Sequence, residues 1–302
     1  MSKLCCLLPL LWASPAPAQD RVAPGQFVAW TQKDGPKTLT SGGTTAAITA
    51  APCEGEEAGP DCYRAEVAVT VAGKPPVTLM GESGRAYRVA IGRLNAGDSG
   101  ASVVLQTFTG GAHCCDVFTV AEPLGDAVRI VPIAWRPEGA SEPQTEFDFG
   151  DIPFPADLSG DGRADFVLRD DRFLYEFASY AGSMAPPIVL GIEDGKTVDV
   201  SADPAFAETF GEELRQAKAI CTDAQGFDRN GACAAYVGAA ARLGRFDEAW
   251  AVMLRHYDRR STTGLTRCTS DYVDDKCPHE EHFKDFPAAL RAFLIRTGYI
   301  AG

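Results

Sequence analysis

Residues 157–168 read Asp157-Leu-Ser-Gly-Asp-Gly-Arg-Ala-Asp-Phe-Val-Leu168. Oxygen-bearing side chains stand at positions 1, 3, 5 and 9 of this stretch, and a glycine stands at position 6, where a calcium loop turns sharply. A hard cation takes roughly 6 to 8 oxygen ligands at about 2.3–2.6 Å. The spacing therefore predicts one structural Ca²⁺, held by Asp157, Ser159, Asp161, the backbone carbonyl of Arg163, and Asp165.

The competing interpretation of this stretch is a polar turn without metal, since Asp and Gly are common turn residues. Three carboxylates within nine residues repel one another unless a cation neutralises them, and this favours the calcium loop. Position 12 is Leu168 rather than a bidentate Glu, which excludes an EF-hand. In an exported module such a site is expected to bind with a Kd of about 10⁻⁴ to 10⁻³ M, so the ion would be structural.

Two textures divide the chain. From Gln26 to about Val200, short β-branched or alternating runs are separated by Gly, Pro, Asn and Asp, which predicts strands and turns. The predicted strands are 65–71, 87–91, 102–108, 117–120, 128–133 and 165–169. After Asp203-Pro204, apolar residues recur at helical spacing over 205–221, 231–243, 246–257 and 286–296. The sequence predicts an α+β protein in two parts: an antiparallel β-rich domain over 19–202 and a disulfide-tied helical domain over 203–302.

The stretch from Phe149-Gly150 through Leu168 resembles the FG-GAP motif of integrin α-chain propellers and related bacterial VCBS-type repeats. The resemblance covers about twenty residues, and it implies that the loop links two strands of a propeller blade and holds calcium. The chain departs from the family pattern at Arg169-Asp170-Asp171, where the family has Gly-Ala-Pro. Asp170-Asp171 is expected at the surface.

A weaker copy of the same pattern begins about 63 residues earlier. Residues 97–105 align with residues 160–168, but Leu94 replaces Asp157 and Ser102 replaces Asp165, so calcium is not expected in the copy. Two blade-like units cannot close a ring of four to eight blades. We therefore expect incomplete propeller-blade-like units rather than a true propeller.

The first residues have the order of a secretory signal. Lys3 precedes an apolar run from Leu4 to Trp12, and Ala16-Pro-Ala18 supplies a small-residue cleavage site, so residues 1–18 are predicted to be a signal peptide. No stretch reaches the roughly 18 apolar residues of a transmembrane helix, so no membrane span is expected. A periplasmic or secreted location follows. In its signal sequence and its Gly-Gly-Ala-His-Cys-Cys segment the chain resembles uncharacterised periplasmic proteins of Gram-negative bacteria.

The net charge of the chain disfavours some classes of binding partner. The chain carries 28 Lys and Arg against 41 Asp and Glu, a formal net charge of −13. Such a surface repels nucleic acid and anionic membranes. We expect a protein partner, whose identity the sequence does not give.

Six cysteines fall into close pairs: Cys53 with Cys62, Cys221 with Cys233, and Cys268 with Cys277. In an exported chain such pairs predict local disulfides. The alternative is structural zinc, but none of these pairs has the two-to-four-residue gap of zinc ligands.

The segment Gly110-Gly-Ala-His-Cys-Cys115 admits two interpretations. The cysteines either form structural disulfides, or His113, Cys114 and Cys115 form a soft-metal or redox site, because thiolate and imidazole suit copper or zinc. His279-Glu-Glu-His282 has its histidines three apart instead of four, so we interpret it as a polar loop and not a zinc helix.

Residues 233–250 resemble one tetratricopeptide-type helical hairpin, with Gly244 at the helix end that needs a left-handed backbone. Because such arrays need about three repeats, a small disulfide-tied helical domain is the favoured interpretation. Taken together, the sequence predicts an exported calcium-binding module that binds or supports another protein and has no catalytic site. The alternative is a periplasmic thiol-redox or hydrolytic enzyme centred on His113, Cys114 and Cys115.

Overall fold

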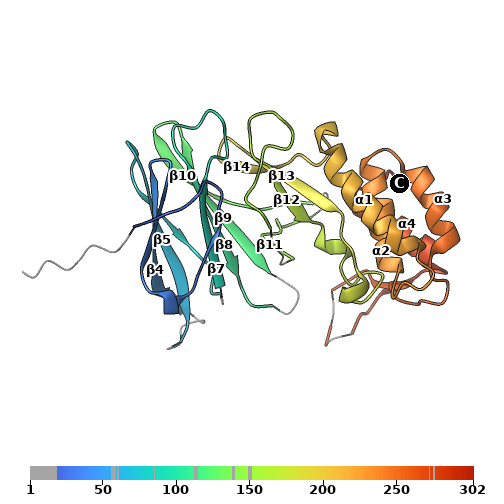
Figure 1. Ribbon diagram of the computed structural model, residues 1–302. Helices are drawn as coiled ribbons and strands as arrows, with labels where there is room; N and C mark the ends of the chain where they lie inside the picture. Colours follow the sequence, from blue (N-terminus) through green and yellow to red (C-terminus); the bar gives the residue numbers. More distant parts are fainter. Residues whose placement is uncertain are drawn as a thin grey trace, which may run out of the picture.

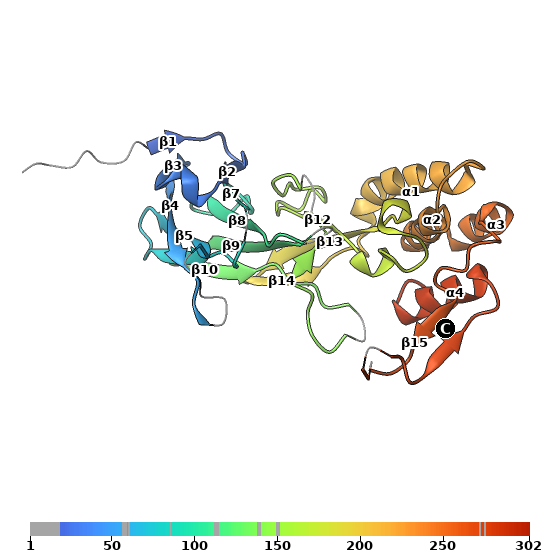
Figure 2. The same cartoon turned by 90° about the horizontal axis from the view of Figure 1, so that it is seen from below.

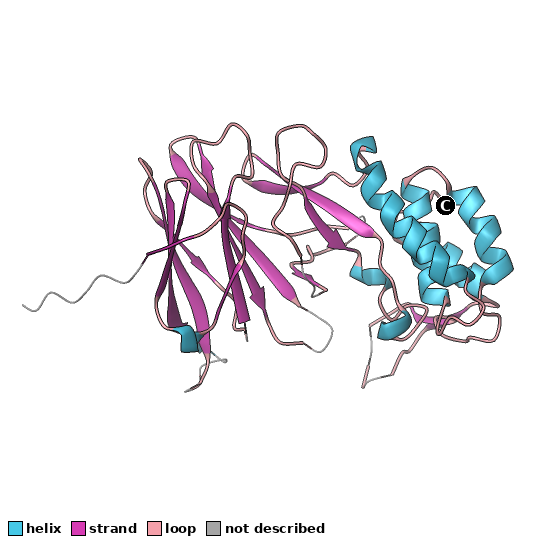
Figure 3. Cartoon of the chain, viewed as in Figure 1, coloured by secondary structure: helices cyan, strands magenta, loops and turns pink. Residues whose placement is uncertain are grey.

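The computed structural model describes residues 19–55, 59, 61–84, 86–111, 115–137, 140–148, 152–271, 273–274 and 276–302. The predicted signal segment 1–18 lies outside the described residues, as do Phe149 and Gly150. Strands fill the part of the chain that comes first and helices the part that comes last (Figure 3). The two-part α+β architecture is confirmed.

The strands of the β-rich part form three sheets. The first sheet has the order β1-β3-β4-β5-β6, from Gln19–Arg21, Lys37–Ser41, Thr44–Pro52, Tyr63–Val71 and Val77–Met80. The second has the order β10-β9-β8-β7-β2, from Ala127–Pro132, Asp116–Leu124, Ser102–Phe108, Ala86–Gly92 and Val28–Trp30, and β11 (Glu146–Phe147) also pairs with β9. The third has the order β12-β13-β14, from Phe166–Arg169, Pro187–Glu193 and Lys196–Asp199.

The sheets are stacked in series, and the helices stand at the far end of the stack (Figures 1 and 2). Strand β8 shows how the stacking arises from the sequence, because successive side chains of a strand point to opposite faces. Val103 and Leu105 pack into the core between the first and second sheets, whereas Val104 packs into the core between the second and third. A strand buried on both faces needs apolar residues in succession, which β8 supplies at Val103, Val104 and Leu105. Its buried polar residues, Ser102, Gln106 and Thr107, flank this run.

Strand β13 repeats this arrangement one layer further along. Ile188 and Leu190 face the second sheet, while Val189 packs against Phe206 and Phe210 at the start of α1. The third sheet therefore stands between the second sheet and the helices.

The helical part contains α1 (Ala207–Thr222), α2 (Asn230–Arg242), α3 (Phe246–His256), α4 (Phe286–Arg296) and a small hairpin, β15 (Thr266–Cys268) with β16 (Glu280–His282). Helix α2 is buried from Asn230 to Ala240. Its small residues let α1 approach closely, and the disulfide Cys221–Cys233 ties the two helices. Gly244 has φ +66, as its place between α2 and α3 predicts.

The helical core also takes in residues that precede β13. Phe173 stacks edge-on against Phe293 with ring centroids 4.7 Å apart, and Phe177 stacks against Phe286 at 5.1 Å. The segment between β12 and β13 therefore enters the helical part and packs beneath α4 before the chain returns to the third sheet.

The structure confirms the predicted strands and helices to within a few residues, and also the disulfides Cys53–Cys62, Cys221–Cys233 and Cys268–Cys277. It departs from the expectation of an antiparallel β part in one pair, because β1 and β3 run parallel. The interpretation of 279–282 as a loop is wrong, since residues 280–282 form β16, held against Thr266–Cys268.

Over the described part of the chain, no helix is long and apolar enough to cross a membrane.

Gly231→Ala tests the packing of α2. An added Cβ would lie 2.8 Å from the Ala178 Cβ and 2.9 Å from the Ser183 Cα, closer than real Cβ contacts allow. Alanine gains up to about 1 kcal/mol of helix propensity, but forcing α2 away from backbone costs about 1–3 kcal/mol. We expect a net loss of up to about 2 kcal/mol in the free energy of unfolding, measured in urea.

Gly211→Ala is the matched control in α1, because its added Cβ meets only the end of a flexible arginine at 3.7 Å. This variant should be as stable as the parent or more stable. Equal changes in midpoint for Gly231→Ala and Gly211→Ala would contradict the packing described.

Candidate functional site

The predicted calcium loop leads directly into β12. An antiparallel bridge between Ala156 and Asp165 closes its base, with the Asp165 N–H donating to the Ala156 carbonyl at 2.9 Å. Gly160 has φ +79 and Gly162 has φ +88, a region that side chains other than glycine rarely adopt. The two glycines therefore let the loop turn back on itself.

The loop's carboxylates are held by its own backbone. Asp157 accepts from the N–H groups of Gly160 at 2.7 Å and Gly162 at 2.9 Å. Asp161 accepts from the Arg163 N–H at 2.8 Å. Asp165 accepts from the N–H groups at 158 and 159, at 2.9 and 3.2 Å. The Ser159 Oγ lies 3.5 Å from the Asp157 Oδ1, so the predicted ligands lie together in one loop.

Asp165 is the buried member of the set, with 5% of its surface exposed. Burial raises its pKa, the negative charges of Asp161 and Asp157 raise it further, and the two backbone N–H groups that it accepts from oppose the shift. A cation beside these three carboxylates would remove both the repulsion and the cost of burying an ionised group.

The donors fit calcium in kind, because all of them are hard oxygens. A carboxylate has about four lone-pair sites, and the backbone N–H groups use only some of them. The described residues contain no group of three or more Asp, Glu, His or Cys side chains gathered as a metal site. The carboxylates that would hold the ion accept hydrogen bonds from the loop's backbone.

The loop also joins two sheets. Its Gly162 carbonyl accepts from the Ala96 N–H at 2.7 Å, and its Ala164 N–H donates to the Leu94 carbonyl at 2.6 Å. We call this backbone pairing of 94–96 with 162–164 the loop seam. Arg163 reaches Glu193 of β13 at 2.7 Å. The weaker sequence copy thus lies beside the better one, and the loop connects β11 of the second sheet to β12 of the third.

The FG-GAP resemblance implies that the loop links two strands of one blade. In the structure the loop instead links strands of two different sheets. In the weaker copy, residues 93–101 do link neighbouring strands of one sheet, β7 and β8. The better copy crosses between sheets because β11 pairs with β9 and β12 pairs with β13.

A buried glutamate lies beside the loop seam. Glu122 of β9 is 1% exposed, and its Oε1 accepts from the Asn95 amide at 2.6 Å. Burial raises its pKa, and the charge of Asp98 raises it further, against the bond from Asn95.

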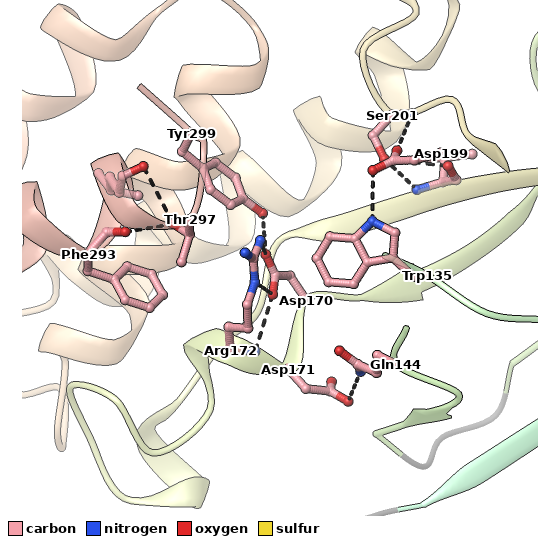
Figure 4. Close-up of polar contacts among 12 residues, drawn as sticks. Trp135, Gln144, Asp170, Asp171, Arg172, Asp199, Ser201, Phe293, Thr297 and Tyr299 are labelled. Carbon is pink, nitrogen blue, oxygen red and sulfur yellow. Dashed lines mark hydrogen bonds and ion pairs between the residues drawn. The ribbon is translucent and has the colours of Figure 1, made fainter. Parts of the chain in front are cut away.

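A second polar cluster, which the sequence did not reveal, lies where β12 meets the helical part (Figure 4). The expectation that Asp170-Asp171 lies at the surface is wrong, because Asp170 is 0% exposed. Arg172 donates to both oxygens of Asp170, at 2.8 and 2.7 Å, and the Tyr299 hydroxyl donates to Oδ2 at 2.9 Å. The charge is buried because it is paired and fully bonded.

Asp171 points the other way, toward the second sheet (Figure 4). Its Oδ2 accepts from the Asp148 N–H at 2.9 Å and the Gln144 amide at 3.1 Å. Its Oδ1 is buried without a hydrogen bond within the described residues. Burial raises the pKa of Asp171 to about 7, the charges of Asp148 and Asp170 add to the shift, and the backbone bond from Asp148 opposes it.

Tyr180 completes the cluster by donating its hydroxyl to the Asp148 Oδ1 at 2.8 Å. Burial and this bond raise the pKa of Tyr180 to about 12. Trp135 joins the cluster to the third sheet: the Arg172 guanidinium stands 4.8 Å above its ring, and its Nε1 donates to Asp199 at 2.8 Å. The cluster can therefore hold or release a proton at Asp171 near neutral pH.

The other predicted site is only partly visible. His113 and Cys114 lie outside the described residues, while Cys115 is disulfide-bonded. The choice between a structural and a redox role for this segment stays open.

Asp171→Asn should flatten the pH dependence of stability. The pKa of Asp171 is raised from 3.8 to about 7, so the folded protein binds a proton there that the unfolded chain lacks between these values. The contribution to the free energy of unfolding is complete below about pH 4 and falls as the pH rises toward 7, by at most roughly 1.4 kcal/mol per unit.

Urea unfolding between about pH 4.5 and 8 measures this slope. Asp171→Asn keeps an acceptor oxygen and loses the titration, so its slope should be smaller than that of the parent. Asp126→Asn, at an exposed turn, should follow the parent. Identical slopes for Asp171→Asn and the parent would show that Asp171 does not titrate in this range.

Comparison with known proteins bears mainly on the helical part. Residues 210–298, from α1 to just past α4, match a family model described as the sll0997 C-terminal domain. The segment of the FG-GAP resemblance lies outside this match, so that resemblance stays a prediction.

Two curated relatives extend the similarity into the β-rich part. Over 209 residues the chain is 39% identical to "Probable thylakoid lumen protein sll0997" of Synechocystis, an alignment covering 66% of this chain and 56% of the relative. Over 204 residues it is 32% identical to "Uncharacterized protein y4bJ" of Sinorhizobium fredii, covering 66% of this chain and 30% of the relative. No solved structure matches the chain. About two thirds of this chain is therefore similar to each relative. The chain spans 56% of the length of the first relative and 30% of the length of the second.

Proposed function

We propose that the chain is an exported module that binds one structural Ca²⁺ at residues 157–165 and uses the stiffened β scaffold to bind a protein partner. The observation that carries the proposal is the position of the loop. Three carboxylates crowd a turn whose backbone joins the second sheet to the third, and the innermost of them, Asp165, is buried.

The ion's role is mechanical in this proposal. The ion would be held by Asp157, Ser159, Asp161, the Arg163 carbonyl and Asp165. It would supply positive charge to a turn whose own cation, the Arg163 side chain, bonds to Glu193 instead. Closing the turn also fixes Gly162 and Ala164, which bond to residues 94–96 of the neighbouring sheet. Calcium would therefore stabilise the contact between two layers.

Three features support export and binding. Local disulfides persist in oxidising compartments, and the chain has three between described residues. The relative in Synechocystis carries the name of a thylakoid lumen protein. The net charge of −13 suits a basic or neutral protein surface as partner and disfavours nucleic acid.

The second candidate is an enzyme centred on His113, Cys114 and Cys115. Cys115 is disulfide-bonded, which favours a structural role for this segment over a soft-metal or redox site.

Calcium should raise the melting temperature of the parent. With a Kd of about 10⁻⁴ to 10⁻³ M, about 10 mM free calcium adds roughly 1.4–2.7 kcal/mol to the free energy of unfolding. For a chain of this size the gain corresponds to a few degrees. Asp161→Asn removes one charged ligand and should abolish most of the shift, which scanning calorimetry with calcium or with chelator measures.

Asp126→Asn is the control, because it removes one carboxylate of equal charge from an exposed turn far along the chain from the loop. It should keep the calcium shift of the parent. If the parent melts at the same temperature with calcium and with chelator, the calcium site is refuted.

A further inference from the structure

A cleft lies between the third sheet and α1. Its volume is about 340 Å³, at the lower end of the range for small-ligand sites. Val167 and Leu168 of β12 and Pro187 of β13 give it apolar walls. Helix α1 forms the opposite wall, so the cleft sits at the junction of the β-rich and helical parts.

The polar groups of the cleft are predominantly acidic. Asp148, Glu212 and Glu213 line it, against one cation, Arg169. Arg169 is already engaged, because its Nη1 lies 3.0 Å from the Glu213 Oε1 and also donates to the Ala185 carbonyl at 3.1 Å. Glu212 is paired as well, with Arg215. Among the described lining residues, Asp148 is therefore the carboxylate without a cationic partner.

Asp148 is the carboxylate with the least positive surroundings. Within the described part of the chain its side chain accepts from the neutral Tyr180 hydroxyl at 2.8 Å. The nearby guanidinium of Arg172 donates from Nε and Nη2 to Asp170 instead. Behind Asp148 stands Asp171, which bonds to the Asp148 backbone and has one buried oxygen without a partner in the described part of the chain.

Two tyrosine rings lie near this carboxylate, outside the set of residues that line the cleft. The Tyr180 ring ends at Asp148, and the Tyr175 ring packs 5.7 Å from it, centroid to centroid, with 55% of Tyr175 exposed. Tyr175 also holds φ +61, a conformation that is rare for a bulky residue. Cations are attracted to ring faces as well as to carboxylates.

We propose that this junction cleft binds an organic cation, an ammonium or guanidinium group carried on an apolar stem. The stem fits the walls formed by β12 and β13, and the cation meets Asp148 at the rim. A free amine and the side chain of a Lys or Arg in a partner protein share this chemistry. The site shares no ligand with the calcium loop, so each can fail without the other.

Titration calorimetry of the full chain at low ionic strength tests the site. The first arm compares n-pentylammonium with n-pentanol and pentanoate, which have the same stem with neutral and negative heads. The second compares the capped peptide Gly-Arg-Gly with Gly-Gln-Gly. We expect pentylammonium to bind and the neutral and negative probes not to bind. Added binding of the arginine peptide identifies a partner's side chain as the source, and its absence identifies a free amine.

Variants locate the binding. Asp148→Asn keeps the size of the side chain and should weaken binding of pentylammonium about tenfold or more, as loss of a charge-assisted bond does. Asp126→Asn should leave it unchanged. Thr209→Phe, on the α1 wall, should block the cleft with no change in charge, and it serves if Asp148→Asn fails to fold.

Three results would overturn the proposal: no binding of either cationic probe, equal binding of pentanol and pentylammonium, or unchanged affinity in a folded Asp148→Asn. Loss of calcium binding in Asp161→Asn with retained binding of pentylammonium would leave it standing.

Discussion

The loop seam holds the layers of this protein in register. Two short backbone bonds, from Ala96 N–H to the Gly162 carbonyl and from Ala164 N–H to the Leu94 carbonyl, join a turn of the second sheet to the turn before the third. The third sheet in turn carries α1, because Val189 packs against Phe206 and Phe210. A shift at the seam would therefore move the helical part as well, and it is at this seam that the charged loop of residues 157–165 sits.

Packing between layers explains why the central strands carry apolar residues on both of their faces. Val103 and Val104 of β8 face different cores, and Ile188 and Val189 of β13 do the same one layer further on. The core among the helices is not formed by helical residues alone. Phe173 and Phe177, from the segment between β12 and β13, are part of it. The two parts are therefore interlocked, and the buried ion pair of Asp170 with Arg172 lies where they meet.

Sequence alone was sufficient where the determining contacts are local. Four features of this kind are the β-branched run of β8, the small residues of α2, the left-handed Gly244, and the cystine spacings of nine and twelve residues. Each acts between residues that are close together in the chain. Burial of Asp170 was missed because its second side-chain partner, Tyr299, is 129 residues away. The crossing of the loop between two sheets was missed for the same reason, because β11 pairs with β9, which lies earlier in the chain. The sequence did offer one signal of this burial. The charged residues Asp170-Asp171-Arg172 lie between a buried strand and an aromatic run.

Amide hydrogen exchange at the loop seam tests the account most directly, because it reads the bonds that a bound ion would stabilise. With calcium, the N–H groups of Ala96, Ala164 and Asp165 should exchange more slowly than with chelator, while amides of α3 should not change. In Asp161→Asn the difference at the seam should vanish. Equal exchange at these three amides with and without calcium would contradict the claim that calcium braces the second sheet against the third.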